Sequence, residues 1–279
     1  MHLPRIEIPK RVIQRVEYFS RYEGVEDEFG FDPETVKRWQ PFFQFLYEEY
    51  FQVETTGLEN IPAEGRGVLV GNHSGTLPVD AFMLFSGVLT HHSAPRRIRC
   101  LTHNSLLNTK VVKDVIRGYG GVPATYDVAC KLLENDELVN FYPEGPRGTG
   151  KLFSMRYRLY DFDPGFVKAA IATGSPIIPI TTVGADEIYP LLANIKSIAR
   201  LMGTPYWPIT PTFPLLPYST SCLPLPIKFY IKIGKPIYLN YPPEKASDKK
   251  LRLKICREIQ YGIQHDMNSL LRERKSPFA

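Results

Sequence analysis

Short apolar runs alternate along this chain with longer amphipathic segments. Runs rich in Val, Ile and Leu that end in Gly, Pro, Asn or charged residues are typical of buried strands. The predicted strands are residues 67–72, 98–103, 137–142, 176–183 and 228–233, and the predicted helices are residues 80–90, 126–135, 164–173 and 248–273. Strands that alternate with helices favour a parallel or mixed sheet with helices on its faces. The sequence therefore predicts an α/β fold, with a mostly parallel or mixed central sheet flanked by helices.

Length and composition are consistent with one large globular domain. The chain has 279 residues, of which 43% are hydrophobic and 23% are charged, and these are globular values. We expect an α/β domain over residues 55–279, preceded by an amphipathic helical segment over residues 1–54 that is a candidate for membrane contact. The four cysteines are scattered without paired spacing, as expected of reduced thiols in a cytosolic protein. The net charge of +5 is modest, and we expect no nucleic-acid partner.

A histidine and an aspartate stand at the end of the first predicted strand. His73 follows Asn72 directly, and Leu77-Pro78 then indicates a helix start with Asp80 in the first turn. In open α/β sheets, ligands bind at the carboxyl ends of the strands. A histidine base and a carboxylate that orients it are together sufficient to deprotonate a hydroxyl group. The structural alternative is a histidine that is simply solvated or hydrogen-bonded.

A second strand, within residues 137–142, leads into a loop dense in Gly, Pro and charged residues. Four loop groups are candidates for binding an anion: the guanidinium of Arg147, the ammonium of Lys151, and the backbone amides of Gly148 and Gly150. The structural alternative is that Pro-Glu-Gly-Pro serves only as a turn.

Other chemistries fit the sequence less well. Residues 145–151 have the spacing of a nucleotide-binding P-loop, but Leu152 stands where that motif needs Ser or Thr. Residues 71–75 place the serine one position too late for a hydrolase elbow. His91, His92 and His103 lack metal-ligand spacing with a carboxylate, so we expect structural or solvated histidines and no metal.

Taken together, the two segments resemble the glycerolipid acyltransferase family, of the 1-acylglycerol-3-phosphate acyltransferase type. The first family motif is Asn-His, four intervening residues and Asp. Here six residues separate His73 from Asp80, and this Asn-His-Ser-Gly-x-Leu-Pro-x-Asp variant resembles a divergent branch of the family. The third motif, Phe-Pro-Glu-Gly-x-Arg, is matched by Pro143, Glu144, Gly145 and Arg147, and residues 175–180 resemble the family's strand with a central proline. The resemblance covers about residues 55–240.

The resemblance implies the transfer of a fatty acyl group from an acyl-CoA or acyl-ACP thioester to a lipid hydroxyl. His73 would be the general base, and Asp80 would fix its tautomer. Glu144, Gly145 and Arg147 would belong to the substrate-binding loop, with Glu144 bracing that loop. No bound cofactor is implied, because the thioester is a co-substrate.

Two questions of function stay open at this point. Glycerol-phosphate enzymes of the family carry a phosphate-binding arginine where this chain has residues 120–125, which contain none. A lysophospholipid or glycerolipid acceptor therefore has a rival in a neutral alcohol such as diacylglycerol. The rival of a different class is a non-catalytic lipid-binding or membrane-tethering protein on the same fold.

Three segments indicate contact with a membrane surface. Residues 9–22 have the pattern of a basic amphipathic helix, residues 41–51 are rich in aromatic side chains, and residues 210–226 form an apolar loop broken by prolines. Each has a structural alternative, in which the segment packs on its own domain. No apolar run reaches the roughly 18 residues that span a bilayer. We therefore expect a peripheral or monotopic protein on the cytoplasmic side of a membrane, and the sequence leaves its oligomeric state open.

Overall fold

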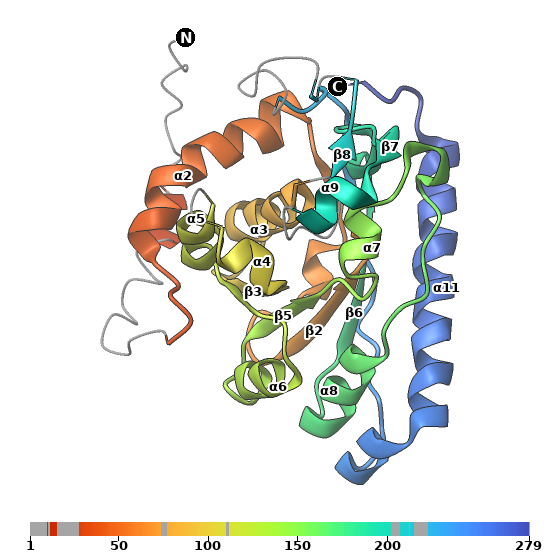
Figure 1. Ribbon diagram of the computed structural model, residues 1–279. Coiled ribbons are helices and arrows are strands. Elements are labelled where there is room, and N and C mark those ends of the chain that lie inside the picture. The colour runs from red at the N-terminus through yellow and green to blue at the C-terminus, as the bar shows by residue number, and fades with distance from the viewer. Residues whose placement is uncertain are drawn as a thin grey trace.

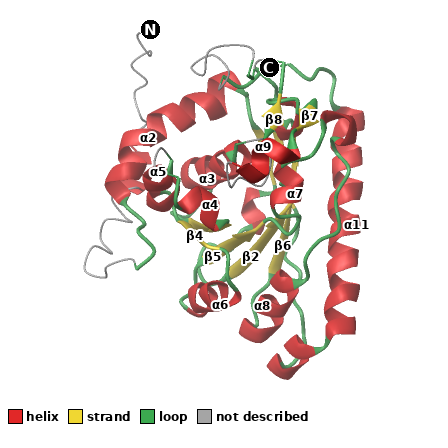
Figure 2. Ribbon diagram, in the orientation of Figure 1, coloured by secondary structure: helices red, strands yellow, loops and turns green. Residues whose placement is uncertain are grey.

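The computed structural model describes residues 10, 12–15, 28–73, 77–109, 112–201, 207–211, 213–214 and 223–278. Within them, helices cover both faces of a central sheet, in a single α/β domain (Figures 1 and 2). The strands of this sheet are β1 (Glu54–Thr56), β2 (Gly67–Gly71), β3 (Ile98–Thr102), β4 (Gly121–Pro123), β5 (Leu138–Phe141), β6 (Ile177–Val183) and β9 (Tyr230–Ile233). The predicted fold class is confirmed.

The sheet is mixed but mostly parallel. Its strand order is β1-β9-β6-β2-β5-β3-β4. Strand β2 runs parallel to β5 and β6, and β3 runs parallel to β4 and β5. Strand β9 is antiparallel to β6, and β1 is parallel to β9. Five strands therefore present their carboxyl ends at one edge of the sheet, where α/β proteins place their ligands.

The helices form one layer on each face of the sheet, joined by shorter helices in the loops. One layer contains α2 (Pro33–Phe45), its π-helical continuation Leu46–Tyr50, α3 (Val79–His91) and α5 (Lys113–Gly118), and the other contains α6 (Tyr126–Glu134), α8 (Gly165–Thr173) and α11 (Lys249–Glu273). The loops carry α4 (Asn104–Leu107), α7 (Pro146–Thr149), α9 (Lys196–Leu201) and a small ladder of β7 (Ala193–Asn194) and β8 (Pro208–Ile209).

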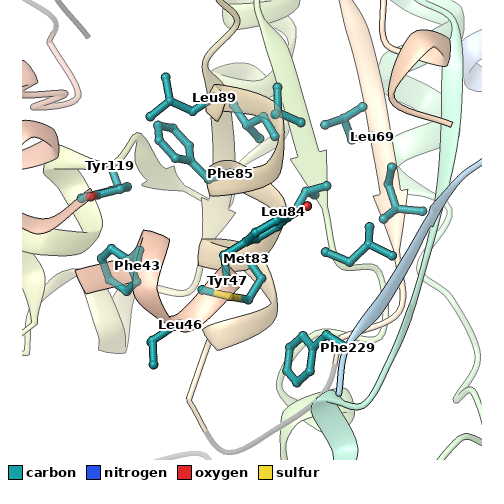
Figure 3. Packing of buried hydrophobic residues seen from close by; sticks show 14 of the residues in the cluster. Phe43, Leu46, Tyr47, Leu69, Met83, Leu84, Phe85, Leu89, Tyr119 and Phe229 are labelled. Carbon is teal, nitrogen blue, oxygen red and sulfur yellow. The ribbon is translucent and has the colours of Figure 1, made fainter. Parts of the chain in front are cut away.

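Strand β2 shows why the sheet needs two helical layers. All five of its residues are buried. Leu69 faces the cluster that contains Met83 and Phe85 of α3 (Figure 3), whereas Val68 and Val70 face the cluster on the α8 side. Successive residues of a strand point to opposite faces, so a continuous apolar run requires cover on both sides.

The aromatic segment 41–51 belongs mainly to the core. Phe43 stacks on Phe82 of α3 with ring centroids 4.2 Å apart, and Phe51 stacks on Phe229 at 4.7 Å. Phe42 is the exception, with 37% of its surface exposed. The described residues thus favour the structural alternative for most of this segment.

The strand and helix predictions agree with the structure to within one or two residues at each end. The main omissions are β1 and β4, whereas α2 lies within the predicted helical segment 1–54 without having had its bounds predicted. Strands β1 and β4 have three residues each, which is too short for an alternating pattern to be recognised. Helix α2 has a clear start signal in Asp32, whose side chain accepts hydrogen bonds from the Glu34 and Thr35 amides.

The other two segments predicted to contact a membrane lie largely outside the described residues. For 9–22, Val12 is buried and Arg15 Nη1 donates a hydrogen bond to the Leu89 carbonyl at 2.9 Å, so this part contacts α3. For 210–226, the description is confined to residues 210–211, 213–214 and 223–226. Among the described residues, no helix is both long enough and apolar enough to cross a bilayer.

Candidate active site

The side chains of His73 and Asp80 meet at the carboxyl end of β2. His73 Nδ1 lies 2.8 Å from Asp80 Oδ2. Asp80 sits in the first turn of α3, and its side chain is fully buried. An ionised carboxylate can only accept hydrogen bonds, so in the neutral imidazole this contact selects the tautomer with the proton on Nδ1 and the lone pair on Nε2. The six-residue spacing thus permits the arrangement that a general base requires.

Asn72, the first residue of the Asn-His pair, anchors the end of β2. Its side-chain amide donates to the Thr182 carbonyl at 2.9 Å, and its oxygen accepts from the Thr182 amide at 2.8 Å. Thr182 lies on the neighbouring strand β6. These two bonds fix the backbone immediately before His73, a role that the sequence pattern did not reveal.

Tyr142 forms one wall of the histidine site. Its ring stacks on the His73 ring with centroids 4.1 Å apart and an interplanar angle of 13°. Burial raises the pKa of Tyr142 well above its ordinary value, so the phenol stays neutral near pH 7. The stacked ring restricts rotation of the imidazole, together with the Asp80 carboxylate.

A cavity of about 550 Å³ opens beside His73. Its walls come from the segments that follow β2, β3, β4 and β5, and they include His73, Leu101, His103, Leu106, Ala124, Thr125, Phe141, Tyr142, Gly145, Pro146, Thr149, Asp163 and Phe166. Most of the lining is apolar, and hydroxyl groups of Ser and Thr supply much of the rest. A smaller apolar cavity under α3 shares Pro78, Ala81, Cys100 and Thr102 with it and reaches Phe85 and Tyr119.

Cys100 lies where the two cavities meet. Burial raises the pKa of its thiol to about 11. Because the thiolate is the nucleophilic form, this cysteine is poorly suited to forming an acyl-enzyme near neutral pH.

Gly145 and Gly148 shape the loop that faces His73. Gly145 has φ of +60° and ψ of −151°, a conformation that is essentially restricted to glycine. A Cβ on Gly148 would lie 2.7 Å from the His73 carbonyl oxygen, so only glycine allows α7 to approach so closely. The two glycines bring the turn after β5 against the backbone of the histidine.

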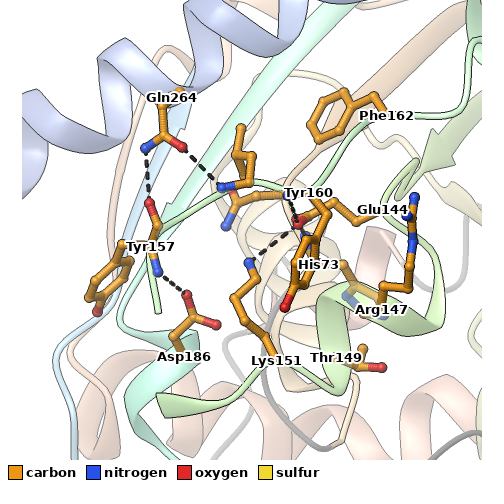
Figure 4. A network of polar contacts seen from close by, with 12 residues as sticks. His73, Glu144, Arg147, Thr149, Lys151, Tyr157, Tyr160, Phe162, Asp186 and Gln264 are labelled. Atoms are coloured by element: carbon orange, nitrogen blue, oxygen red, sulfur yellow. Dashed lines mark hydrogen bonds and ion pairs between the residues drawn. The ribbon is translucent and has the colours of Figure 1, made fainter. Parts of the chain in front are cut away.

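Glu144 ties three segments together beneath this loop (Figure 4). Its Oε1 accepts a hydrogen bond from the His73 amide at 3.3 Å, and its Oε2 accepts one from the Tyr160 amide at 2.8 Å. Lys151 Nζ lies 3.3 Å from Oε2, and both side chains are buried. This geometry favours a bracing role for Glu144 over direct contact with a substrate.

Three of the four expected anion-binding groups are engaged within the protein. Lys151 is buried against Glu144, and it also opposes the rise in the pKa of Asp186 that burial causes. The Gly148 amide donates to the Gly145 carbonyl, and the Gly150 amide donates to the Pro146 carbonyl. For these three groups the described contacts therefore favour the structural alternative, in which the segment serves as a turn. The loop closes on its own carbonyls, unlike the phosphate cradle of a P-loop.

Arg147 and His103 occupy more open positions. Arg147 is exposed and donates from Nη2 to the Asp161 carbonyl at 3.0 Å, and it is not part of the cavity wall described above. Its assignment to substrate binding stays a prediction.

His103 lines the cavity and accepts a hydrogen bond from the Ser105 amide. His92 is a structural histidine, since both of its ring nitrogens contact backbone carbonyls.

Replacing Lys151 with methionine is expected to lower the free energy of unfolding by about 3–5 kcal/mol, because the change leaves the buried Glu144 carboxylate without its cation. Urea unfolding followed by circular dichroism measures this effect. The control is Lys37→Met. That change removes an exposed ion pair with Glu34, which is worth about 1 kcal/mol or less. Equal losses from the two variants would contradict the bracing role.

Comparison with known proteins decides the family. A model of the acyltransferase family matches residues 52–183, a span that includes both motifs. The chain belongs to the acyltransferase family. An uncharacterized protein of Mycobacterium leprae is 40% identical over 255 residues, covering 90% of this chain and 69% of the relative. The segment from β1 to the end of β6 therefore forms the acyltransferase region.

Two named proteins are more distant from this acyltransferase. Phytyl ester synthase 1 of Arabidopsis thaliana, a chloroplast protein, is 25% identical over 243 residues, which cover 78% of this chain and 34% of the relative. The crystal structure of the 1-acyl-sn-glycerophosphate acyltransferase of Thermotoga maritima has a TM-score of 0.50 at 20% identity, covering 92% of this chain and 97% of that one. This structural likeness shows that the two chains share a fold.

Proposed function

We propose that this acyltransferase moves a fatty acyl group from an acyl-CoA or acyl-ACP thioester to the hydroxyl group of a lipid. The observation that carries the proposal is the 2.8 Å contact between His73 and Asp80 on the wall of a largely apolar cavity. Because Asp80 occupies Nδ1, Nε2 remains as the proton acceptor. Apolar walls are suited to the hydrocarbon chains of both substrates.

The proposed reaction proceeds by direct transfer. The lipid hydroxyl oxygen attacks the thioester carbonyl carbon while its proton passes to His73 Nε2. Asp80 stabilises the resulting imidazolium. Collapse of the tetrahedral intermediate breaks the C–S bond, and the departing thiolate takes the proton from the imidazolium. The products are an ester and a free thiol.

The acceptor is a lysophospholipid or glycerolipid, or a neutral alcohol such as diacylglycerol. A specific observation favours the neutral acceptor. Ala124, Thr125 and Tyr126 line the cavity after β4, near the point where glycerol-phosphate enzymes are expected to carry an arginine. The 25% identity to a protein named phytyl ester synthase also supports an acceptor without phosphate.

Thiol release and ester formation test the proposal together. Purified protein receives an acyl-CoA or acyl-ACP with either lysophosphatidic acid or diacylglycerol as the acceptor. We expect thiol release that depends on the acceptor and equals the ester recovered by chromatography, with diacylglycerol the better acceptor. Binding of lipid without thiol release from either donor would instead favour the non-catalytic alternative.

The proposal includes an interfacial location, because both the acceptor and the product are lipids. We propose a peripheral or monotopic protein on the cytoplasmic side of a membrane, with residues 1–54 contributing to membrane contact and residues 55–279 forming the catalytic domain.

A further inference from the structure

Figure 1 shows α9, β7 and β8 together at one end of the molecule. Large apolar side chains on and near these elements are exposed. Leu201 is 85% exposed, Leu223 is 59% exposed and Leu192 is 57% exposed. Leu152 and Ile195 are each 36% exposed. We call these five residues the leucine surface. Exposed leucine side chains grouped at one end of a protein indicate an interaction site.

Backbone hydrogen bonds join the segments that carry the leucine surface. The Phe153 amide donates to the Leu191 carbonyl at 2.8 Å, which places Leu152 beside Leu192. The Leu225 amide donates to the Ile188 carbonyl at 2.9 Å, which connects the segment of Leu223 to the same region. The segments of Leu152 and Leu223 are thus held against the segment of residues 188–192, which leads into β7 and α9.

Exposed cations accompany these leucines. Arg156 and Arg158 follow Leu152, and Lys196 and Arg200 lie on α9. The nearby carboxylates of Asp186 and Glu187 are buried, and Glu187 pairs closely with Arg274 at 2.6 Å and more loosely with Arg156 at 3.9 Å. The sequence from residue 188 to 243 contains neither Asp nor Glu and five Lys or Arg residues. Two of the five, Lys228 and Lys232, pair with Glu54 and Asp266 on other elements, which leaves the cations of α9 for a partner. The charge of this region is therefore complementary to an anionic partner.

The leucine surface adjoins the loop that borders the cavity. Gly145, Pro146 and Thr149 line the cavity, and Leu152 follows them in the same loop. Leu152 is thus three residues from Thr149, which lines the cavity. A docking surface so close to the cavity is what an enzyme with lipid substrates requires.

We propose that the leucine surface, with Arg156, Arg158, Lys196 and Arg200, docks this acyltransferase on an anionic phospholipid bilayer. The leucines enter the interface between headgroups and acyl chains, and the cations contact the headgroup phosphates. The inference rests on the proposed function, because lipid substrates are the reason for docking on a bilayer. Vesicle binding can nevertheless be measured without any catalysis.

Co-sedimentation with vesicles tests the docking surface. The vesicles contain either phosphatidylcholine alone or equal parts of phosphatidylcholine and phosphatidylglycerol. We expect the triple variant L192S/L201S/L223S to bind the anionic vesicles at least about tenfold more weakly than the wild type, because three apolar contacts are lost. The triple variant R156Q/K196Q/R200Q is expected to lose binding to the anionic vesicles and to lose the salt dependence of that binding.

The matched control is the double variant Y238S/Y261S. Tyr238 and Tyr261 are 69% and 75% exposed, but they lie on the segment after β9 and on α11, away from the leucine surface. This variant is expected to bind vesicles like the wild type. Circular dichroism melts of all variants establish that each is folded.

Activity on two kinds of acceptor separates docking from catalysis. With a short-chain acceptor that is soluble in water, the leucine variant is expected to match the wild-type rate, and with an acceptor in vesicles it is expected to be slower. Wild-type vesicle binding by the leucine variant would overturn the proposal. The proposal would also be overturned if the wild-type protein does not bind vesicles and instead binds an acidic acyl carrier protein, or a second copy of itself, through this surface. Vesicle binding without any thiol release would overturn the proposed function alone.

Discussion

The variant His73→Ala is expected to lower the rate of acyl transfer by about 10²- to 10⁴-fold, the usual contribution of a positioned general base. The His73 imidazole lies on the described cavity wall, and its contact with Asp80 leaves Nε2 as the proton acceptor. Without it, the lipid hydroxyl must lose its proton to water, and the departing thiolate loses its proton donor. Initial rates of thiol release and ester formation, measured at saturating thioester, give the ratio of kcat values.

His265→Ala is the matched control for this variant. His265 lies on α11 with 66% of its side chain exposed, and it takes no part in the cavity wall. Its removal is expected to leave the rate unchanged. Because His73 is partly buried against Tyr142, a thermal melt checks that the fold is intact. A folded His73→Ala variant with the wild-type rate would remove the basis of the proposed mechanism.

The second large effect is expected for Asp80→Asn. The amide can donate its own hydrogen to Nδ1, which would shift the imidazole proton to Nε2 and leave no lone pair toward the substrate. An equivalent change in the serine protease triad costs about 10⁴-fold in kcat, and we expect at least about 10²-fold here. Measured KM values for the thioester should change little, since Asp80 is fully buried and is not part of the cavity wall.

The control for Asp80→Asn is Asp114→Asn. Both aspartates occupy the first turn of a helix, Asp80 in α3 and Asp114 in α5, but Asp114 is exposed. Removing a charge from the first turn of a helix at an exposed position costs less than about 1 kcal/mol of stability. The control separates this effect from the loss of the carboxylate that contacts His73. Equal kcat losses in both variants would contradict the orienting role of Asp80.

The parts of the fold that were predictable are those with strong local patterns. Strand β2 is a continuous apolar run closed by Gly-Asn, and α8 lies between Pro164 and Gly174, which has the left-handed conformation of a C-cap. Strand β4 has three residues, so its pattern is too short to be read. The direction of β9 depends on how the chain returns to its place between β1 and β6, and residue spacing does not record that path.

The site was predictable in its chemistry but less so in its contacts. Lys151 was expected to bind an anion, yet it is buried against Glu144, because the segment that carries Tyr157 and Tyr160 folds back over the loop. The stacking of Tyr142 on His73 and the close approach at Gly148 join segments about 70 residues apart. Such contacts leave no trace in local periodicity.

The sequence by itself determined the alternation of strands and helices and the two polar motifs that follow β2 and β5, because these are encoded in neighbouring residues. Only the tertiary structure decided which motif groups face the cavity and which brace it. A side chain's burial depends on the segments that close over it. Here those segments lie beyond the reach of local periodicity, since the Tyr160 amide contacts Glu144 from 16 residues away and Asp186 acts on Lys151 from a separate loop. The position of the leucine surface beside the cavity was decided in the same way.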